Sequence, residues 1–241
     1  PGHGWKHYFF EFFMLFLAVF CGFLAENARE HSVERQREKE YITSLVRDLE
    51  YDTLQFNSTI RKFQNRLPFF DSVFQFLNGP ATFDNKLPYS YWGKTDLVSV
   101  YIPAETTIQQ LKNSGNFRLL ENTDILDSIL IYDSHINGGY LTQTNYVLEF
   151  HKRLIQVKEK VFDNTNFNHF LDDYNRDQVN NESDYGLVLF SNDKTAIKEL
   201  FNTYVELKAS VIFYISQLRE RTKEAENLLA FIKKEYHLEN E

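Results

Sequence analysis

Hydrophobic and polar positions separate an apolar run near the start of the chain from a long series of amphipathic stretches. The apolar run extends from Tyr8 to Ala25 and contains one charged residue, Glu11. Its length is close to the ~20 apolar residues that a helix needs to cross a bilayer. Trp5 precedes the run, where aromatic side chains are common at a membrane interface. We therefore expect residues 1–26 to form a transmembrane anchor.

Two other interpretations of this run stay open. A buried core helix of a soluble protein can be equally apolar, and the run lies at the short end of the range for a spanning helix. A secretory signal peptide has a shorter apolar core that is followed by a small-residue cleavage site. Here Glu26 and Asn27 lead directly into a charged helical pattern. The sequence therefore favours an uncleaved anchor.

The acid in the run lies on a face that differs from the rest of the anchor. At ~100° per residue, every Phe of the run lies about 100° or more from Glu11. The residues within about 40° of it are Leu15, Ala18, Gly22 and Ala25. Small residues allow helices to approach closely in a membrane, and intramembrane acids usually face other helices. We therefore predict a helix-packing face; the alternative is that Glu11 reaches the membrane interface and has no role.

A polar stretch and an amphipathic stretch follow the anchor without any Gly or Pro. Residues 27–40 are almost wholly polar, which predicts a helical stalk exposed to solvent. Apolar side chains then recur three or four positions apart, so the helix is expected to continue to Pro68. A second, shorter helix is expected from Pro68 to the residue before Gly79, because proline favours helix starts and glycine follows helix ends.

The middle of the chain predicts a loop, a short strand and two helices. The strand is expected at Leu97 to Ile102, within a region of loop character. A helix should follow Pro103 and end at Gly115, with that glycine in a left-handed conformation. A longer helix should begin at an Asn122 or Thr123 cap, bend near Gly138 and Gly139, and end near Phe162.

The rest of the chain predicts a polar loop and one long final helix. Ser191 or Asn192 is expected to cap this helix, whose apolar side chains follow a helical period to Tyr236. We therefore expect an all-α fold with three parts: an anchor at 1–26, a polar helical stalk at 27–40 and a helical bundle at 41–241. The composition agrees, since 43% hydrophobic and 25% charged residues are typical of globular proteins and only 9 Gly and 5 Pro leave little turn material.

Three segments together resemble an uncharacterised bacterial family of single-span anchored helical proteins. They are the anchor with its early Glu11, the segment EKEYITSLVRDLEYDTLQ, and the segment TTIQQLKNSGNFRLLEN. Members of the family have a Gly/Ile-rich span opening with GEI, an E-Y-L-x-x-L-x-x-D-L block and an L-K-x-S-G-N element. The likeness covers roughly half of the chain. This span departs from the family by being Phe-rich, with Ala18 where Gly is usual. The resemblance implies a bacterial envelope location and no activity.

The sequence lacks the motifs of the common enzyme and metal sites. None of the 7 His residues follows a Glu at the spacing used in carboxylate-bridged metal sites, and no HExxH motif is present. The chain also lacks a G-x-S-x-G nucleophile motif and a phosphate-binding glycine loop. Its one cysteine, Cys21, lies inside the apolar run. We therefore expect no enzyme activity and no cofactor.

One segment has a partial calcium-loop pattern. Asp173, Asn175, Asp177 and Asp184 occupy ligand positions of such a loop. Gln178, however, stands where the turn needs Gly, and Asp184 replaces the bidentate Glu. A solvated acidic loop is the preferred interpretation, so these residues are only a weak metal candidate.

Charge bears on the partners and on the side of the membrane. A net charge of −8 without a basic cluster argues against nucleic acid as a partner. More basic residues follow the run than precede it, which alone favours a cytoplasmic domain. The sequence opens at Pro1 without a methionine, and the family resemblance implies a basic extension before it. With such an extension we expect the domain on the periplasmic side of the inner membrane.

Two classes of function are consistent with these patterns. The first is a scaffold or accessory subunit that binds the lipid bilayer and other membrane-protein subunits or further copies of itself. The second is a helical sensor of a small ligand, for which we expect an output domain or second span that the sequence does not contain. An ion-coupled subunit that uses Glu11 as a proton site is a variant of the first class.

Overall fold

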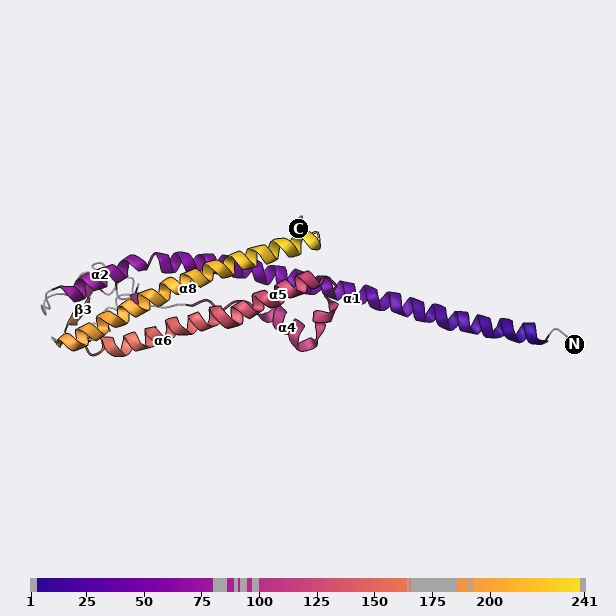
Figure 1. Ribbon diagram of the computed structural model, residues 1–241, viewed down its shortest axis with the longest axis horizontal. Coiled ribbons are helices and arrows are strands. Elements are labelled where there is room, and N and C mark those ends of the chain that lie inside the picture. Colours follow the sequence, from indigo (N-terminus) through magenta and orange to yellow (C-terminus); the bar gives the residue numbers. More distant parts are fainter. Residues whose placement is uncertain are drawn as a thin grey trace.

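A single helix, α1, runs from Gly4 to Gln64 and determines the elongated shape of the molecule (Figure 1). The computed structural model describes residues 4–79, 86–88, 91, 95–96, 100–163, 165, 186–189, 191 and 193–238. The first part of α1 projects alone, and all other elements pack around its second part. The mostly helical fold expected from the sequence is confirmed.

The first helix ends close to the predicted position. A two-residue turn separates α1 from α2, Leu67–Asn78, and Pro68 stands in the first turn of α2. Proline fits there because the first helical N–H groups have no partner within the helix. Gly79 follows the last residue of α2 as predicted, although its backbone is extended (φ −72°).

The helix near residue 110 ends as the sequence predicts. Helix α4 spans Thr106–Ser114, so it begins three residues after the predicted Pro103, and Gly115 has φ +69°. Glycine occupies this left-handed region at little cost, which is why the helix stops there. A short 3₁₀ turn, η1 at Asn116–Leu119, then leads to the next helix.

The next helix contains an irregular turn at the two predicted glycines. Helix α5 spans Thr123–His135 and is capped by Asn122, whose side chain accepts hydrogen bonds from the N–H groups of residues 124 and 125. Residues Ile136–Tyr140 form a π-turn, η2, and α6 continues from Leu141 to Lys158. The predicted cap and bend are confirmed, but α6 ends four residues before Phe162.

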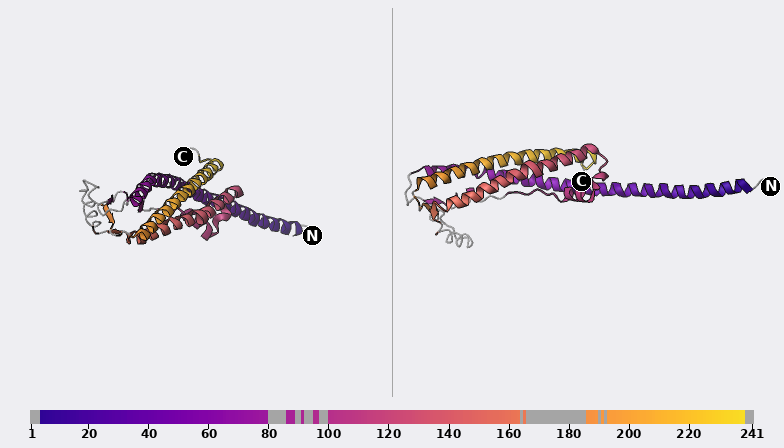
Figure 2. Two further views of the ribbon diagram at one scale, coloured as in Figure 1. Left: turned by 60° about the vertical axis from the view of Figure 1, so that its left-hand side comes forward. Right: turned by 60° about the horizontal axis from the view of Figure 1, so that its bottom comes forward.

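The last long helix, α8, spans Lys194–Glu235 and returns along α1 and α6. Two views show α8 crossing α1 while α6 runs beside it (Figure 2). The predicted cap at Ser191 or Asn192 is wrong, because Asp193 accepts the hydrogen bond from the N–H of Thr195. Ser191 instead accepts a hydrogen bond from the N–H of Asp193.

A small antiparallel sheet lies at the end of the molecule far from the N-terminus. Strand β3, Gly186–Leu189, pairs with β1, Lys86–Pro88, on one side and with β2, Phe162–Asp163, on the other. This sheet was not predicted. The predicted strand at Leu97 to Ile102 is wrong for residues 100–102, which form no strand. The N–H and carbonyl of Tyr101 bond to side chains instead, and residues 97–99 lie outside the described part.

Aromatic side chains from three elements form the centre of the core. Phe56 and Phe63 of α1, Tyr140 of η2, and Tyr204 and Tyr214 of α8 are fully buried. Several of these rings meet edge to face, for example Phe63 and Tyr214 with centroids 5.3 Å apart. Such contacts add to the burial of apolar area. The first part of α1 contributes no residue to this core.

Candidate functional site

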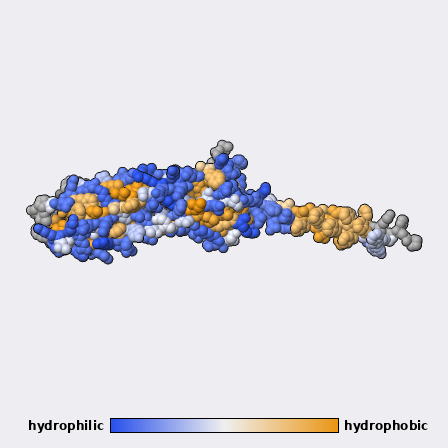
Figure 3. Space-filling view, viewed as in Figure 1, coloured by the Kyte–Doolittle hydropathy of each residue, from blue (hydrophilic) through white to orange (hydrophobic). Residues whose placement is uncertain are grey.

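The apolar part of α1 is exposed along its whole length. Every side chain described from Trp5 to Val33 is exposed, including Phe10 and Phe23 at 67% each. The space-filling view shows an apolar cylinder that projects from a mostly hydrophilic body (Figure 3). Within the described residues, α1 is the one helix long and apolar enough to cross a membrane. Because none of these side chains is buried, the core-helix interpretation is unsupported.

The predicted packing face lies on one open side of this helix. Leu15 is 68% exposed, and no atom lies within 4 Å of the position that a Cβ on Gly22 would take. Glu11, Ala18 and Ala25 are exposed as well. No described residue outside α1 covers the face, so the structure leaves room for a partner but does not itself provide one.

The packing face and the body of the protein lie on opposite sides of α1. Gly22 and the buried Leu49 are about seven and a half turns apart, which places them on opposite sides of an ideal helix. Ala18 and the exposed Leu54 are about ten turns apart and therefore share a side. On an ideal helix, the predicted packing face therefore points away from the side of α1 that the body covers.

The polar stretch that follows the apolar part of α1 contacts the body only near its end. Glu34 forms an ion pair with Arg118, with 3.7 Å between the charged atoms. Glu38 is buried, and its carboxylate accepts hydrogen bonds from the N–H of Glu121 (3.1 Å) and the hydroxyl of Tyr236 (2.6 Å). The part of the stretch before Glu34 makes no described contact with the body.

A buried carboxylate on α1 fixes the segment that leads into α4. Asp52 is 1% exposed and accepts hydrogen bonds from the hydroxyl of Tyr101 (2.7 Å) and the N–H of Ala104 (2.8 Å). The hydroxyl of Tyr132 lies 3.5 Å from its other oxygen. Burial raises the pKa of Asp52 to about 6, although the bonds from Ala104 and Tyr101 oppose this rise. No cation pairs with Asp52 among the described residues.

Two tyrosines of the core bind the same segment from the other side. Tyr214 accepts a hydrogen bond from the N–H of Tyr101 at 3.2 Å, and Tyr140 donates to the carbonyl oxygen of Tyr101 at 2.5 Å. The hydroxyls of Tyr140 and Tyr214 are 2.8 Å apart. The backbone groups of Tyr101 are thus satisfied by side chains, which is why no strand forms there.

A second buried cluster joins residues that the sequence does not connect. Lys158 and Asp96 form an ion pair at 2.6 Å, with side chains 4% and 2% exposed. Asp96 also accepts hydrogen bonds from the hydroxyls of Tyr204 (2.9 Å) and Thr95 (3.0 Å). Buried charges are tolerated only when they are paired in this way. The cluster ties the segment around residue 96 to α6 and α8.

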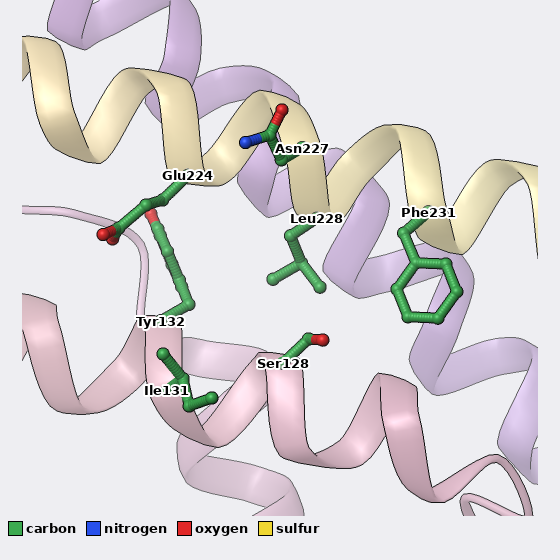
Figure 4. Close-up of a pocket in the computed structure, with 7 residues that line it drawn as sticks. All are labelled: Ser128, Ile131, Tyr132, Glu224, Asn227, Leu228 and Phe231. Carbon is green, nitrogen blue, oxygen red and sulfur yellow. The ribbon is translucent and has the colours of Figure 1, made fainter.

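A shallow pocket of about 280 Å³ opens between α5 and α8 (Figure 4). Tyr132 and Ile131 of α5 face Leu228 and Phe231 of α8, and the carboxylate of Glu224 lies at one end. Glu224 already contacts His135 at 3.0 Å and Arg221 at 3.2 Å. The carboxylate of Glu224 is therefore already engaged by two side chains of the protein.

The structure gives no support to the metal candidate. Asp173, Asn175, Asp177 and Asp184 lie outside the described residues. Elsewhere in the described ranges, no three His, Cys, Asp or Glu side chains are grouped to hold a metal ion.

Sequence reasoning identified the long apolar helix near the N-terminus but missed both buried clusters. Asp52, Asp96 and Lys158 stand at ordinary helical or loop positions, and their partners are distant in sequence. An acid placed on the apolar stripe of a helix, as Asp52 is between Leu49 and Phe56, is the one local signal that could have indicated burial. Comparisons with known protein families, with characterised proteins and with solved structures find no match to this chain.

Proposed function

We propose that the protein is a membrane-anchored helical scaffold or accessory subunit of a bacterial envelope complex. Residues 1–26 hold it in the inner membrane, and the helical body, arranged as a bundle, binds partners outside the bilayer. The observation that carries the proposal is the continuous exposure of large apolar side chains from Trp5 to Leu24. Only a lipid environment or a partner protein makes such a surface favourable.

The open face of the anchor is the proposed contact with another span. Glu11, Leu15, Ala18, Gly22 and Ala25 lie away from the body, so a second helix can follow α1 without meeting it. The helix that packs there belongs to another membrane-protein subunit or to a second copy of the chain. Close packing over Ala18 and Gly22 gives the acid a polar neighbourhood away from lipid.

Crosslinking in membranes tests this face. Gly22→Ile should weaken association at least severalfold, because the branched side chain holds the helix backbones apart. The matched control is Phe20→Ile on the opposite face, which should associate normally. No atom of the described residues lies within 4 Å of the Cβ position of Gly22, so a clash with them within the protomer does not explain a loss. Equal association of both variants would contradict the packing face.

Replacing the acid separates the scaffold from the ion-coupled subunit. Glu11→Gln keeps the shape and hydrogen-bonding capacity of the side chain but cannot carry a proton. A scaffold should assemble and function almost normally with Gln. A subunit that couples to ion movement should assemble normally and lose function.

The body is proposed to lie on the periplasmic side. A cysteine at the exposed position Lys223, in a Cys21→Ser background, provides the test. An impermeant thiol reagent should label this cysteine in cells whose outer membrane has been made permeable. Labelling only after lysis would place the body in the cytoplasm.

A further inference from the structure

The solvent-facing side of α8 carries an exposed apolar patch. Val205, Ile212 and Phe213 are 44%, 49% and 64% exposed. The exposed Ala209 lies between them, and at ~100° per residue all four fall within about 60° of its direction. We refer to these four residues as the α8 patch. The buried side of α8 already packs against α1 and α6, so this side is the one left without a neighbour among the described residues.

Charges of opposite sign lie at the two ends of the α8 patch. Lys198 precedes Ala209 by the same number of residues as Glu220 follows it. Both lie within about 20° of the direction of Ala209 on the helix. Lys198 is exposed, and its ammonium lies 4.8 Å from the ring centre of Phe201. Glu220 has a side chain that is 58% exposed and contacts Arg221 at 3.3 Å.

We propose that the α8 patch is a homotypic contact surface on which two copies of the chain pair with antiparallel α8 helices about Ala209. This register puts Val205 beside the partner's Phe213 and Lys198 opposite the partner's Glu220. The surface is therefore complementary to itself in both apolar character and charge. A parallel pair would instead put Lys198 beside the partner's Lys198 and Glu220 beside the partner's Glu220, so that like charges meet.

The direction of α8 determines where the two anchors of such a pair point. This step rests on the proposed membrane anchor. Tyr236 contacts Glu38, Lys233 contacts Glu50 and Tyr214 packs on Phe63, so α8 runs antiparallel to α1. Two copies with antiparallel α8 helices therefore point their anchors in opposite directions. With the body on the proposed periplasmic side, such a pair joins two membrane surfaces whose periplasmic sides face each other.

The helix length sets the distance between these membranes. Phe63 lies about 55 Å along α1 from the end of the anchor, taking 1.5 Å per residue. Because Tyr214, next to the patch, packs on Phe63, the contact lies at about that height above each membrane. The two membranes would be on the order of 110 Å apart.

Cysteine crosslinking of the full chain in detergent tests the pairing itself. In a Cys21→Ser background, chains with Val205→Cys are mixed with chains with Phe213→Cys and treated with a short bis-maleimide. The mixed product should exceed either homodimer. A predominance of the two homodimers would mean parallel pairing, and no product would mean no contact; either result overturns the proposal.

Charge exchange tests the register. Lys198→Glu alone should lower the crosslinked fraction roughly tenfold, because two ion pairs become two repulsive pairs. The same chain with Glu220→Lys added should recover the wild-type level. Phe213→Ser in the chain that carries Val205→Cys should abolish its crosslinking to the Phe213→Cys chain, because neither chain then supplies the ring, whereas Ile131→Ser, which removes a similarly exposed side chain on α5, should not. Failure of the double exchange to restore pairing would contradict the register.

Vesicle clustering tests the membrane consequence separately. The full chain in phosphatidylcholine–phosphatidylglycerol vesicles should increase light scattering, and Phe213→Ser should prevent the increase. If the protein fails to stay with the vesicles, the anchor is refuted, while the crosslinking in detergent still decides the α8 contact. If it stays but no clustering occurs, the bridging of membranes is refuted.

Discussion

The two parts of α1 share one continuous helical backbone but differ in where their apolar side chains lie. From Trp5 to Leu24 large apolar residues point outward, with Phe10 and Phe23 each 67% exposed. From Glu38 to Phe63 most apolar residues are buried, although Leu54 is exposed, and two carboxylates, Glu38 and Asp52, are buried with them. No break in the helix marks the change. The two parts therefore differ in the environment that their side chains need, and not in backbone conformation.

This contrast shows that the side chains of a helix, and the partners available to them, determine whether the helix is buried in the body or needs another environment. Burial of an acid inside the body is possible because tyrosine hydroxyls and backbone N–H groups from other elements meet it there. The anchor part has no such neighbours in the described chain, and its surface fits lipid or another span. A helix therefore cannot be classified by its backbone, only by what its side chains require.

The largest effect is expected from making the anchor resemble the body. Phe16→Arg together with Phe20→Arg should move the protein out of the carbonate-resistant membrane fraction, since each Arg at the centre of a span costs about 2.5–3.5 kcal/mol. The control is Leu54→Arg with Ile131→Arg, two exposed apolar positions of the body. If the charged anchor stays in the membrane fraction, lipid is not its environment.

The next largest effect should come from breaking a buried pair in the body. Lys158→Met leaves the charge of Asp96 buried without its cation and should lower the free energy of unfolding by about 3–5 kcal/mol. Adding Asp96→Asn removes that charge and keeps an acceptor for Tyr204, so the double variant should lose less. Denaturant titration of the protein in mild detergent measures both. A double variant as unstable as the single one would show that the uncompensated charge is not the cause.

A smaller effect is expected from pH. The carboxyl of Asp52 has a pKa near 6 in the folded protein, raised by burial, and near 4 in an unfolded chain. Between these values Asp52 is more protonated in the folded state than in the unfolded chain, so the stability that it contributes is fully present below pH 4 and is lost as pH rises through 6. The loss is on the order of 3 kcal/mol.

The matched variant for this prediction is Asp52→Asn. It keeps an acceptor for Tyr101 and Ala104 but does not titrate. Its free energy of unfolding should lack the decline between pH 4 and 6. Identical pH profiles for the two proteins in that interval would contradict the assignment to Asp52.

The smallest effect concerns a backbone conformation. Gly115→Val should lower stability by on the order of 1 kcal/mol or slightly more, because a β-branched residue is strained at φ +69°. Gly115→Asn should cost less, since Asn tolerates the left-handed region. Thermal unfolding of the two variants provides the comparison. Equal stability of both variants and the parent would show that this glycine does not determine the end of α4.

The features predicted from sequence were those that local chemistry determines. Gly115, the Asn122 cap and the break before Pro68 each act on residues within a single helical turn, and each was confirmed. The three-stranded sheet and the Asp96–Lys158 pair depend on segments that meet only after folding. Periodicity cannot indicate such meetings. The packing face of the anchor is open in the structure, and the partner that would cover it is still a prediction.

The π-turn at residues 136–140 determines whether a residue can be deleted from this part of the chain. A π-turn is equivalent to one residue inserted into an α-helix. Around it the buried positions follow each other at intervals of four, from Tyr132 through Ile136 and Tyr140 to Thr144, which an α-helix of 3.6 residues per turn cannot sustain. Deleting Gly138 would make the helix regular and rotate α6 by about 100° relative to α5. Tyr140 would then leave Tyr214, so single-residue deletions here should be tolerated far less than substitutions.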